Sequence, residues 1–177
     1  MKSIRALFVI GLLTGSLFAA DYAFAPTRGG VEFTVNHRLL GAVNGRFDKF
    51  DGTIVIDAGA VKALNGSADV ASINTDNVKR DEHLKNGDFF DEPKFPKISF
   101  VSKSASGDEL TGDLTIRDIT KPVTFKVKRD LESGKTGDIY SLTGQIKRSD
   151  FQIGDSITTN AQISDDVVVK LQIRPAI

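Results

Sequence analysis

Three polar residues, His37, Arg80 and His83, are the first candidates for chemistry in this chain. His37 and His83 are its only histidines, and Arg80 lies three positions before the second of them. An imidazole can act as a general base or as a hydrogen-bonding contact. A guanidinium can bind a carboxylate or a phosphate through two parallel hydrogen bonds. These residues could therefore catalyse a reaction or hold the polar group of a ligand, and the alternative for Arg80 is a surface ion pair with Asp81.

Other features of the sequence argue against the common catalytic and metal sites. The chain has no cysteine, so it has no thiol nucleophile and no disulfide. It contains no Gly-x-Ser-x-Gly nucleophile motif, no phosphate-binding loop and no dinucleotide fingerprint. The two histidines with Asp81 or Glu82 do not have the spacing of a strong metal-binding pattern. The sequence therefore predicts no resident metal or cofactor, and nothing in it requires an enzyme.

His37 lies in a stretch, residues 31–38, whose side chains alternate between apolar and polar. Since successive strand side chains point to opposite faces, every second residue shares one face. The apolar face holds Val31, Phe33, Val35 and His37. If the interior is packed solid, His37 is a core histidine with a satisfied hydrogen bond. If the interior is hollow, His37 is a polar contact in an apolar cavity, and this stretch leaves both interpretations open.

The first 19 residues have the organisation of a secretory signal peptide. Lys2 and Arg5 give a positive start, residues 6–13 form an apolar run, and residues 17–19 offer a cleavage site. The run is shorter than the roughly 20 apolar residues that a membrane-spanning helix needs. We therefore expect a periplasmic or secreted protein without stable membrane insertion, with residues 20–177 as its one domain.

Charges of both signs are interspersed through residues 20–177. Without Lys2 and Arg5, 21 basic residues stand against 23 acidic ones, which is a formal charge of −2. Nucleic-acid binding needs a concentrated basic face, and no basic stripe is present. We therefore expect no nucleic-acid partner.

Eight runs in residues 20–177 alternate as β-strands with one apolar and one polar face do. They lie at 31–38, 43–57, 67–73, 97–103, 110–117, 123–128, 140–147 and 167–173. An all-β antiparallel fold follows, either a sandwich of two sheets or a barrel. Glycines inside these runs suit a curved sheet and favour the barrel. They are Gly45, Gly52, Gly112 and Gly144.

Residues 75–86 interrupt the strands with a polar, charged stretch that is compatible with a short helix. Asn74, Thr75 or Asp76 could cap its start, and Gly87 could end it. Three aromatic residues follow, Phe89, Phe90 and Phe95. This arrangement suits a lid over one mouth of a barrel, or an ordinary connection whose rings fill the core.

Motifs across the whole of residues 20–177 resemble those of the YceI-like family. The first are Val31-x-Phe33-x-Val35-x-His37 and Val43-x-Gly45-x-Phe47-x-x-Phe50-x-Gly52. The central one is Ile73-x-Thr75-x-Asn77-x-x-Arg80-Asp81-x-His83-Leu84, which leads to Asp88-Phe89-Phe90-Asp91. Phe95-Pro96-x-Ile98-x-Phe100, Gly112-x-Leu114-x-Ile116 and Arg148-x-Asp150-Phe151-x-Ile153-Gly154 complete the match. Asp118 departs from the pattern, where a glycine is more usual, and this affects one turn.

The resemblance implies a lipocalin-like antiparallel barrel, here of eight strands, with a helical insertion around residues 75–86. It also implies a periplasmic or secreted protein, often a homodimer, that binds polyisoprenoid or other long-chain lipids in an interior tunnel. The predicted ligand-binding residues are Phe33, Val35, His37, Phe47, Arg80, His83, Leu84, Phe89, Phe100, Leu114 and Phe125. Two alternatives stay open: an enzyme acting on an isoprenoid or fatty-acyl substrate with His37 or His83 as general base, and an interaction module without a ligand.

Overall fold

The computed structural model describes residues 19–131 and 137–175, which form an all-β fold. The strands are β1 (Ala20–Phe24), β2 (Gly29–His37), β3 (Gly41–Phe47), β4 (Phe50–Asp57), β5 (Ala60–Asp69), β6 (Ile73–Asn74), β7 (Lys97–Ser106), β8 (Glu109–Ile116), β9 (Ile119–Leu131), β10 (Asp138–Lys147) and β11 (Ile163–Ile173). The helices are α1 (Val78–Lys85) and α2 (Ile157–Gln162), with 3₁₀ turns at Pro26–Arg28, Val70–Ser72 and Arg148–Phe151. The predicted signal peptide lies outside the described residues, apart from its last position.

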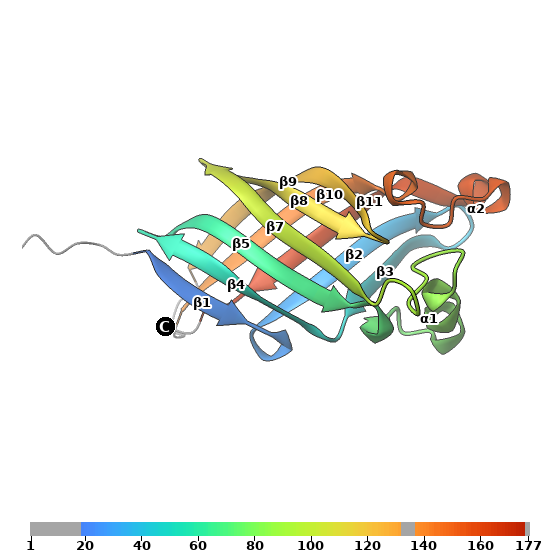
Figure 1. The fold of residues 1–177 in the computed structure, drawn as a ribbon, viewed down its shortest axis with the longest axis horizontal. Helices are drawn as coiled ribbons and strands as arrows, with labels where there is room; N and C mark the ends of the chain where they lie inside the picture. The colour runs from blue at the N-terminus through green and yellow to red at the C-terminus, as the bar shows by residue number, and fades with distance from the viewer. Residues whose placement is uncertain (1–18, 132–136, 176–177) are drawn as a thin grey trace, which may run out of the picture.

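All the described strands belong to one antiparallel sheet, in the order β1-β4-β5-β7-β8-β9-β10-β11-β2-β3-β6. The sheet curls into an elongated half-barrel (Figure 1). One end carries α1, α2 and the β2–β3 turn at residues 38–40, and we call it the helical end. The opposite end carries the β4–β5 and β7–β8 turns, and we call it the turn end. The curled, all-β architecture is confirmed, and the two-sheet sandwich is wrong.

The predicted count of eight strands is not confirmed, since the described residues hold 11. The run at 43–57 bends at Asp48 and Lys49 into β3 and β4, and the run at 67–73 contains the end of β5, a 3₁₀ turn and β6. The remaining strand, β1, pairs with β4 and was not predicted. Strands of five and two residues, such as β1 and β6, show too few alternations to stand out in the sequence.

The bend at Asp48 and Lys49 lets the sheet wrap around its interior. β3 pairs with β2 and β6, whereas β4, the next strand in the chain, pairs with β1 and β5. Backbone hydrogen bonds hold this bend against the turn from β5 to β6. Asp48 N donates to Ser72 O at 3.0 Å, and Asp69 N donates to Lys49 O at 3.0 Å. β3 and β4 lie next to opposite ends of the strand order, and this bend joins them directly in the chain. β1 and β6 are the edge strands.

The interior is packed solid toward the turn end. The side chains there have exposed fractions of 2% or less, and none of them lines the cavity described below. They are Ile54, Leu110, Leu142, Ile173 and Tyr140. The Tyr140 hydroxyl donates to Gly59 O in the β4–β5 turn at 3.3 Å, and burial raises the pKa of this phenol. This cluster, which we call the plug, closes one end of the half-barrel with apolar packing.

The predicted helix at 75–86 is confirmed as α1, with shorter bounds. The Asn77 side chain caps it by accepting a hydrogen bond from Arg80 N at 3.1 Å, and Asn86 stands at its C-terminal end. Of the three aromatic residues that follow, Phe89 and Phe90 are buried and Phe95 is half-buried. The segment after α1 thus covers the helical end with aromatic rings that point inward.

Candidate functional site

An apolar cavity of about 220 Å³ lies between the plug and the helical end. Its walls come from β1, β2, β3, β4, β5, β7, β8, β9, β10 and β11, and α1 contributes two side chains. Ten of the eleven residues predicted from the sequence line it. They are Phe33, Val35, His37, Phe47, Arg80, Leu84, Phe89, Phe100, Leu114 and Phe125. The half-barrel is therefore solid at one end and hollow toward the other.

His83 is the predicted residue that the structure does not place in the cavity wall. Residues four positions apart share one face of a helix, so Arg80 and Leu84 of α1 face the cavity together. His83 is exposed, and its ring lies edge-on to Phe89 with the ring centroids 5.0 Å apart. Its position supports packing of α1 on the segment that follows it.

His37 has features of both interpretations that the sequence left open: it has a satisfied hydrogen bond and it lines a cavity. It is half-buried and lines the cavity, and its Nδ1 accepts hydrogen bonds from Leu39 N at 3.1 Å and Leu40 N at 3.3 Å. A ring nitrogen that accepts carries no proton, so the neutral imidazole has its proton on Nε2. His37 thus shapes the β2–β3 turn through one nitrogen and has a donor on the other.

Arg80 is held in place without a carboxylate partner. Its Nε donates to Thr75 Oγ1 and its Nη2 to Thr75 O, both at 2.8 Å. Asp81 is occupied elsewhere, since its Oδ1 accepts from Thr75 Oγ1 at 2.6 Å and from Thr75 N at 2.9 Å. Among the described residues Arg80 forms no ion pair within 4.0 Å, so the predicted surface pair with Asp81 is wrong. Arg80 therefore lines the apolar cavity while two hydrogen bonds to Thr75 hold its guanidinium, and its charge helps to lower the pKa of the Asp76 carboxyl.

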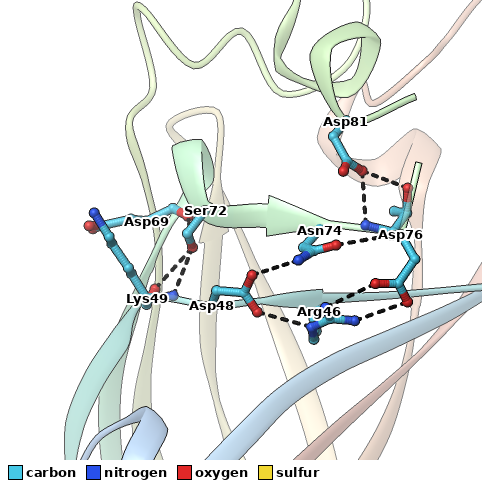
Figure 2. Close-up of polar contacts among 9 residues, drawn as sticks. Arg46, Asp48, Lys49, Asp69, Ser72, Asn74, Asp76 and Asp81 are labelled. Atoms are coloured by element: carbon cyan, nitrogen blue, oxygen red, sulfur yellow. Dashed lines mark hydrogen bonds and ion pairs between the residues drawn. The ribbon is translucent and has the colours of Figure 1, made fainter. Parts of the chain in front are cut away.

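A cluster of polar contacts fixes the start of α1 on the sheet, as Figure 2 shows. Arg46 of β3 binds Asp76 through both terminal nitrogens, at 3.1 and 3.0 Å, and Asp48 through Nε at 3.0 Å. Asn74 of β6 donates to Asp48 at 2.7 Å. The hydrogen bonds from Arg46 hold the pKa of the Asp76 carboxyl below its usual value. This cluster lies on the bend that closes the sheet, and α1, with Arg80, follows it in the chain.

Arg148 is a cavity-lining residue that sequence reasoning did not select. It is 4% exposed, and its five N–H groups donate to neutral oxygen atoms. The acceptors are Ser164 O, Ile153 O, Gly154 O, Asn160 Oδ1 and Ile163 O, at 2.6 to 3.2 Å. All its donors are used, so Arg148 fastens the segment around α2 to the half-barrel. Arg148 begins the 3₁₀ turn after β10, two positions beyond the buried Ile146, and this continued alternation was the available sequence signal.

Phenylalanine rings line the cavity because glycines on adjacent strands make room for them. Phe33 is paired with Gly45, and a Cβ at Gly45 would lie 2.2 Å from the Phe33 ring. Phe125 is paired with Gly144, where the same distance would be 2.8 Å. The rings therefore lie against the bare backbone of the neighbouring strand. This arrangement covers the wall with apolar surface while leaving the centre open.

Neither a metal cluster nor a membrane-spanning helix is found in the described part of the chain. No group of three or more potential ligands gathers there, and none of the helices is long and apolar enough to cross a bilayer. Neither His37 nor His83 hydrogen-bonds to a carboxylate among residues 19–131 and 137–175. The site consists of an apolar chamber with a few polar groups near one end.

A curled all-β half-barrel around an apolar cavity defines a lipocalin-like fold. The YceI-like domain matches residues 22–174 of this chain. A UPF0312 protein of Staphylococcus aureus strain MSSA476 is 39% identical over 128 residues, which cover 71% of this chain and 75% of that protein. The chain therefore belongs to the YceI-like family.

Solved structures share the fold. The Campylobacter jejuni YceI protein has a TM-score of 0.67 and 26% identity, with 97% of each chain covered. Burkholderia cenocepacia BcnA has a TM-score of 0.76 and 23% identity, with 85% of this chain and 98% of that one covered. A polyisoprenoid-binding domain from Saccharophagus degradans has a TM-score of 0.64 and 16% identity, with 89% and 100% covered. At such low identities the last two show the fold alone.

Proposed function

We propose that this protein binds a long-chain apolar or amphiphilic lipid inside its half-barrel, for transport, storage or sequestration. The lipid is of the polyisoprenoid, isoprenoid quinone or fatty amide type. The observation that carries the proposal is the cavity itself, whose wall is apolar on every contributing strand and has Arg80 and His37 near the helical end. Membership of the YceI-like family and the shared fold with a polyisoprenoid-binding domain support it.

The energy of burial favours a long tail. Burying one methylene gains about 0.8 kcal/mol, whereas association costs an estimated 4–15 kcal/mol. A tail of about 5 carbons gains only about 4 kcal/mol and would barely bind, but one well beyond about 15 carbons binds without strong polar contacts. Length and slenderness of the tail therefore select the ligand first, and the head group second.

The size of the cavity requires the wall to move when a long tail binds. At about 220 Å³ it exceeds the roughly 150 Å³ of a dry cavity that admits benzene. It is below the roughly 300–1,000 Å³ of sites for drug-sized ligands. The Phe33 and Phe47 rings of the adjacent strands β2 and β3 both line the cavity and pack against each other, with their centroids 5.8 Å apart. We infer that aromatic rings rotate apart as the tail enters.

The polar groups near the helical end suit the head of an amphiphile. The Arg80 guanidinium has no carboxylate partner among the described residues, and the His37 ring has a donor at Nε2. A head group with oxygen atoms would accept hydrogen bonds from both. The tail would then extend toward the plug. A periplasmic or secreted location and a homodimer complete the proposal, since an exported protein would carry its lipid through an aqueous compartment.

Extraction of the purified protein with organic solvent, followed by mass spectrometry, tests the proposal directly. We expect a long-chain lipid in the extract.

The variant Leu114→Trp adds bulk inside the cavity, where Leu114 is buried, and is expected to release the lipid while the protein stays folded. Val101→Trp is the matched control, since Val101 is 53% exposed on the same part of the sheet. A protein that carries no lipid and takes up none, or a Leu114→Trp protein with full affinity, would contradict the proposal.

Thr75→Val is expected to separate the roles of tail and head group. The substitution keeps the shape of this buried side chain but removes the hydroxyl that Arg80 and Asp81 share. Loss of those partners is expected to lower the free energy of unfolding by about 1–3 kcal/mol. It should also weaken binding of a lipid with an anionic head more than binding of the same tail with a neutral head. Denaturant unfolding and competition binding measure the two effects, and Thr75→Ser should retain both properties.

A further inference from the structure

Exposed large apolar side chains are concentrated at the helical end. The described residues contain five such side chains, and four of them lie on the segments that surround this end. They are Leu39 (80% exposed), Leu40 (67%), Val78 (77%) and Ile157 (91%). We call these four the apolar rim. The fifth, Val101, lies on β7, outside these segments.

The apolar rim comes from three segments that are distant in the sequence. Leu39 and Leu40 form the β2–β3 turn, and Val78 and Ile157 are the first residues of α1 and α2. Figure 1 shows all three segments at the same end of the half-barrel. Arg38 N donates to Gln162 O at 2.7 Å, which joins the turn to the end of α2. The three segments are therefore built into the fold around one opening.

The rim is continuous with the cavity wall. Leu40 lines the cavity and is also 67% exposed, so the cavity reaches the surface at the β2–β3 turn. Arg80 and Leu84 of α1 and Ile163, directly after α2, also line the cavity. The same three segments thus have apolar side chains inside the opening and around it.

The basic residues beside the rim suit a phospholipid surface, and the acidic Asp76, two positions before Val78, is paired with Arg46. Arg38 and Lys79 are exposed and directly adjoin Leu39 and Val78, whereas α2 has no charged residue. Apolar side chains flanked by basic ones are the arrangement with which proteins enter the boundary between head groups and acyl chains. Asp155, two positions before Ile157, is hydrogen-bonded to Asn160 at 3.2 Å.

We propose that the apolar rim docks the helical end onto a phospholipid bilayer, with the opening of the cavity facing the lipid. This inference extends the proposed function, since a long-chain lipid could then pass from the bilayer into the cavity without exposing its tail to water. The four rim side chains enter the interfacial region, and Arg38 and Lys79 contact the phosphate groups. The protein lies on the surface and does not span the bilayer.

Flotation with lipid vesicles tests this proposal. The protein beginning at Ala20 contains all the strands of the sheet and avoids binding through the apolar leader. We expect it to float with phosphatidylcholine vesicles and more strongly when phosphatidylglycerol is added. Leu39→Asp combined with Ile157→Asp places two charges in the contact and is expected to weaken vesicle binding about tenfold or more. Neither residue lines the cavity, so the affinity for a lipid presented in detergent micelles should stay unchanged.

Val101→Asp is the matched control, because it places the same charge on an exposed apolar residue outside the rim. It should bind vesicles like the unmodified protein. Equal losses in the control and the double variant would overturn the proposal, and so would a double variant that floats normally. Loss of a dimer in size-exclusion chromatography without any vesicle binding would instead make the rim a contact between two copies, and would also overturn it. Failure to bind lipid in micelles, with vesicle binding retained, would contradict only the proposed function.

Discussion

Leu142→Ala is expected to lower the free energy of unfolding by about 2–5 kcal/mol, the usual cost of removing a fully buried leucine side chain. Leu142 has no exposed surface and lies in the plug, where the neighbouring side chains have no open space to fill by moving. Chemical denaturation of the two proteins gives the difference directly. The same truncation at Leu171 should cost clearly less.

Leu171 is a strict control, because it is paired with Leu142 across β10 and β11 and faces the same interior. It is half-buried and lines the cavity, so its side chain already borders open space. A smaller loss at Leu171 would show that the interior is packed near the turn end and hollow beyond it. Equal losses would contradict this division of the half-barrel into a solid and an open part.

The alternation of side chains predicted most of the sheet because it is a local signal. In β8, inward Leu110, Leu114 and Ile116 alternate with outward polar residues, and such a pattern needs no knowledge of distant contacts. The bend between β3 and β4 was missed because the alternation of inward and outward side chains starts again after it. Phe47 and Phe50 are both buried although three positions separate them, which an unbroken strand does not allow. That spacing was the one available sign of the bend.

Alternation selected cavity residues on the strands, such as Val35 and Leu114, whereas the residues of α1 were selected as a polar cluster and by the family resemblance. His83 was grouped with Arg80, but the helix turns its side chain away from the face that Arg80 and Leu84 share. Thr75 was not selected because its importance depends on the hydrogen bonds of its hydroxyl, which the strand pattern does not reveal. Arg148 binds acceptors as far as Ser164 in the chain. Contacts of this kind depend on the folded arrangement, and one sequence does not show them.

Gly45→Ala is expected to reduce lipid affinity about tenfold or more while changing stability little. A Cβ at Gly45 would lie 2.2, 2.6 and 2.8 Å from three atoms of the Phe33 ring, and no other atom is as close. The ring must therefore leave its place against β3 and turn into the cavity. The cavity has room for it, and alanine suits a strand better than glycine does, so the protein should stay folded. The space for a lipid tail would be lost to the ring.

The affinity of Gly45→Ala for a long-chain fluorescent lipid, together with its unfolding curve, checks this expectation. Gly87→Ala is the control, because a Cβ at Gly87 meets nothing within 4 Å. Combining Gly45→Ala with Phe33→Leu should restore part of the affinity, since the smaller side chain frees the space that the displaced ring occupied. A Gly45→Ala protein that is stable and binds with full affinity would show that the ring positions do not set the width of the cavity. Restored binding in the double variant would assign that width to the glycine–phenylalanine pairs on adjacent strands.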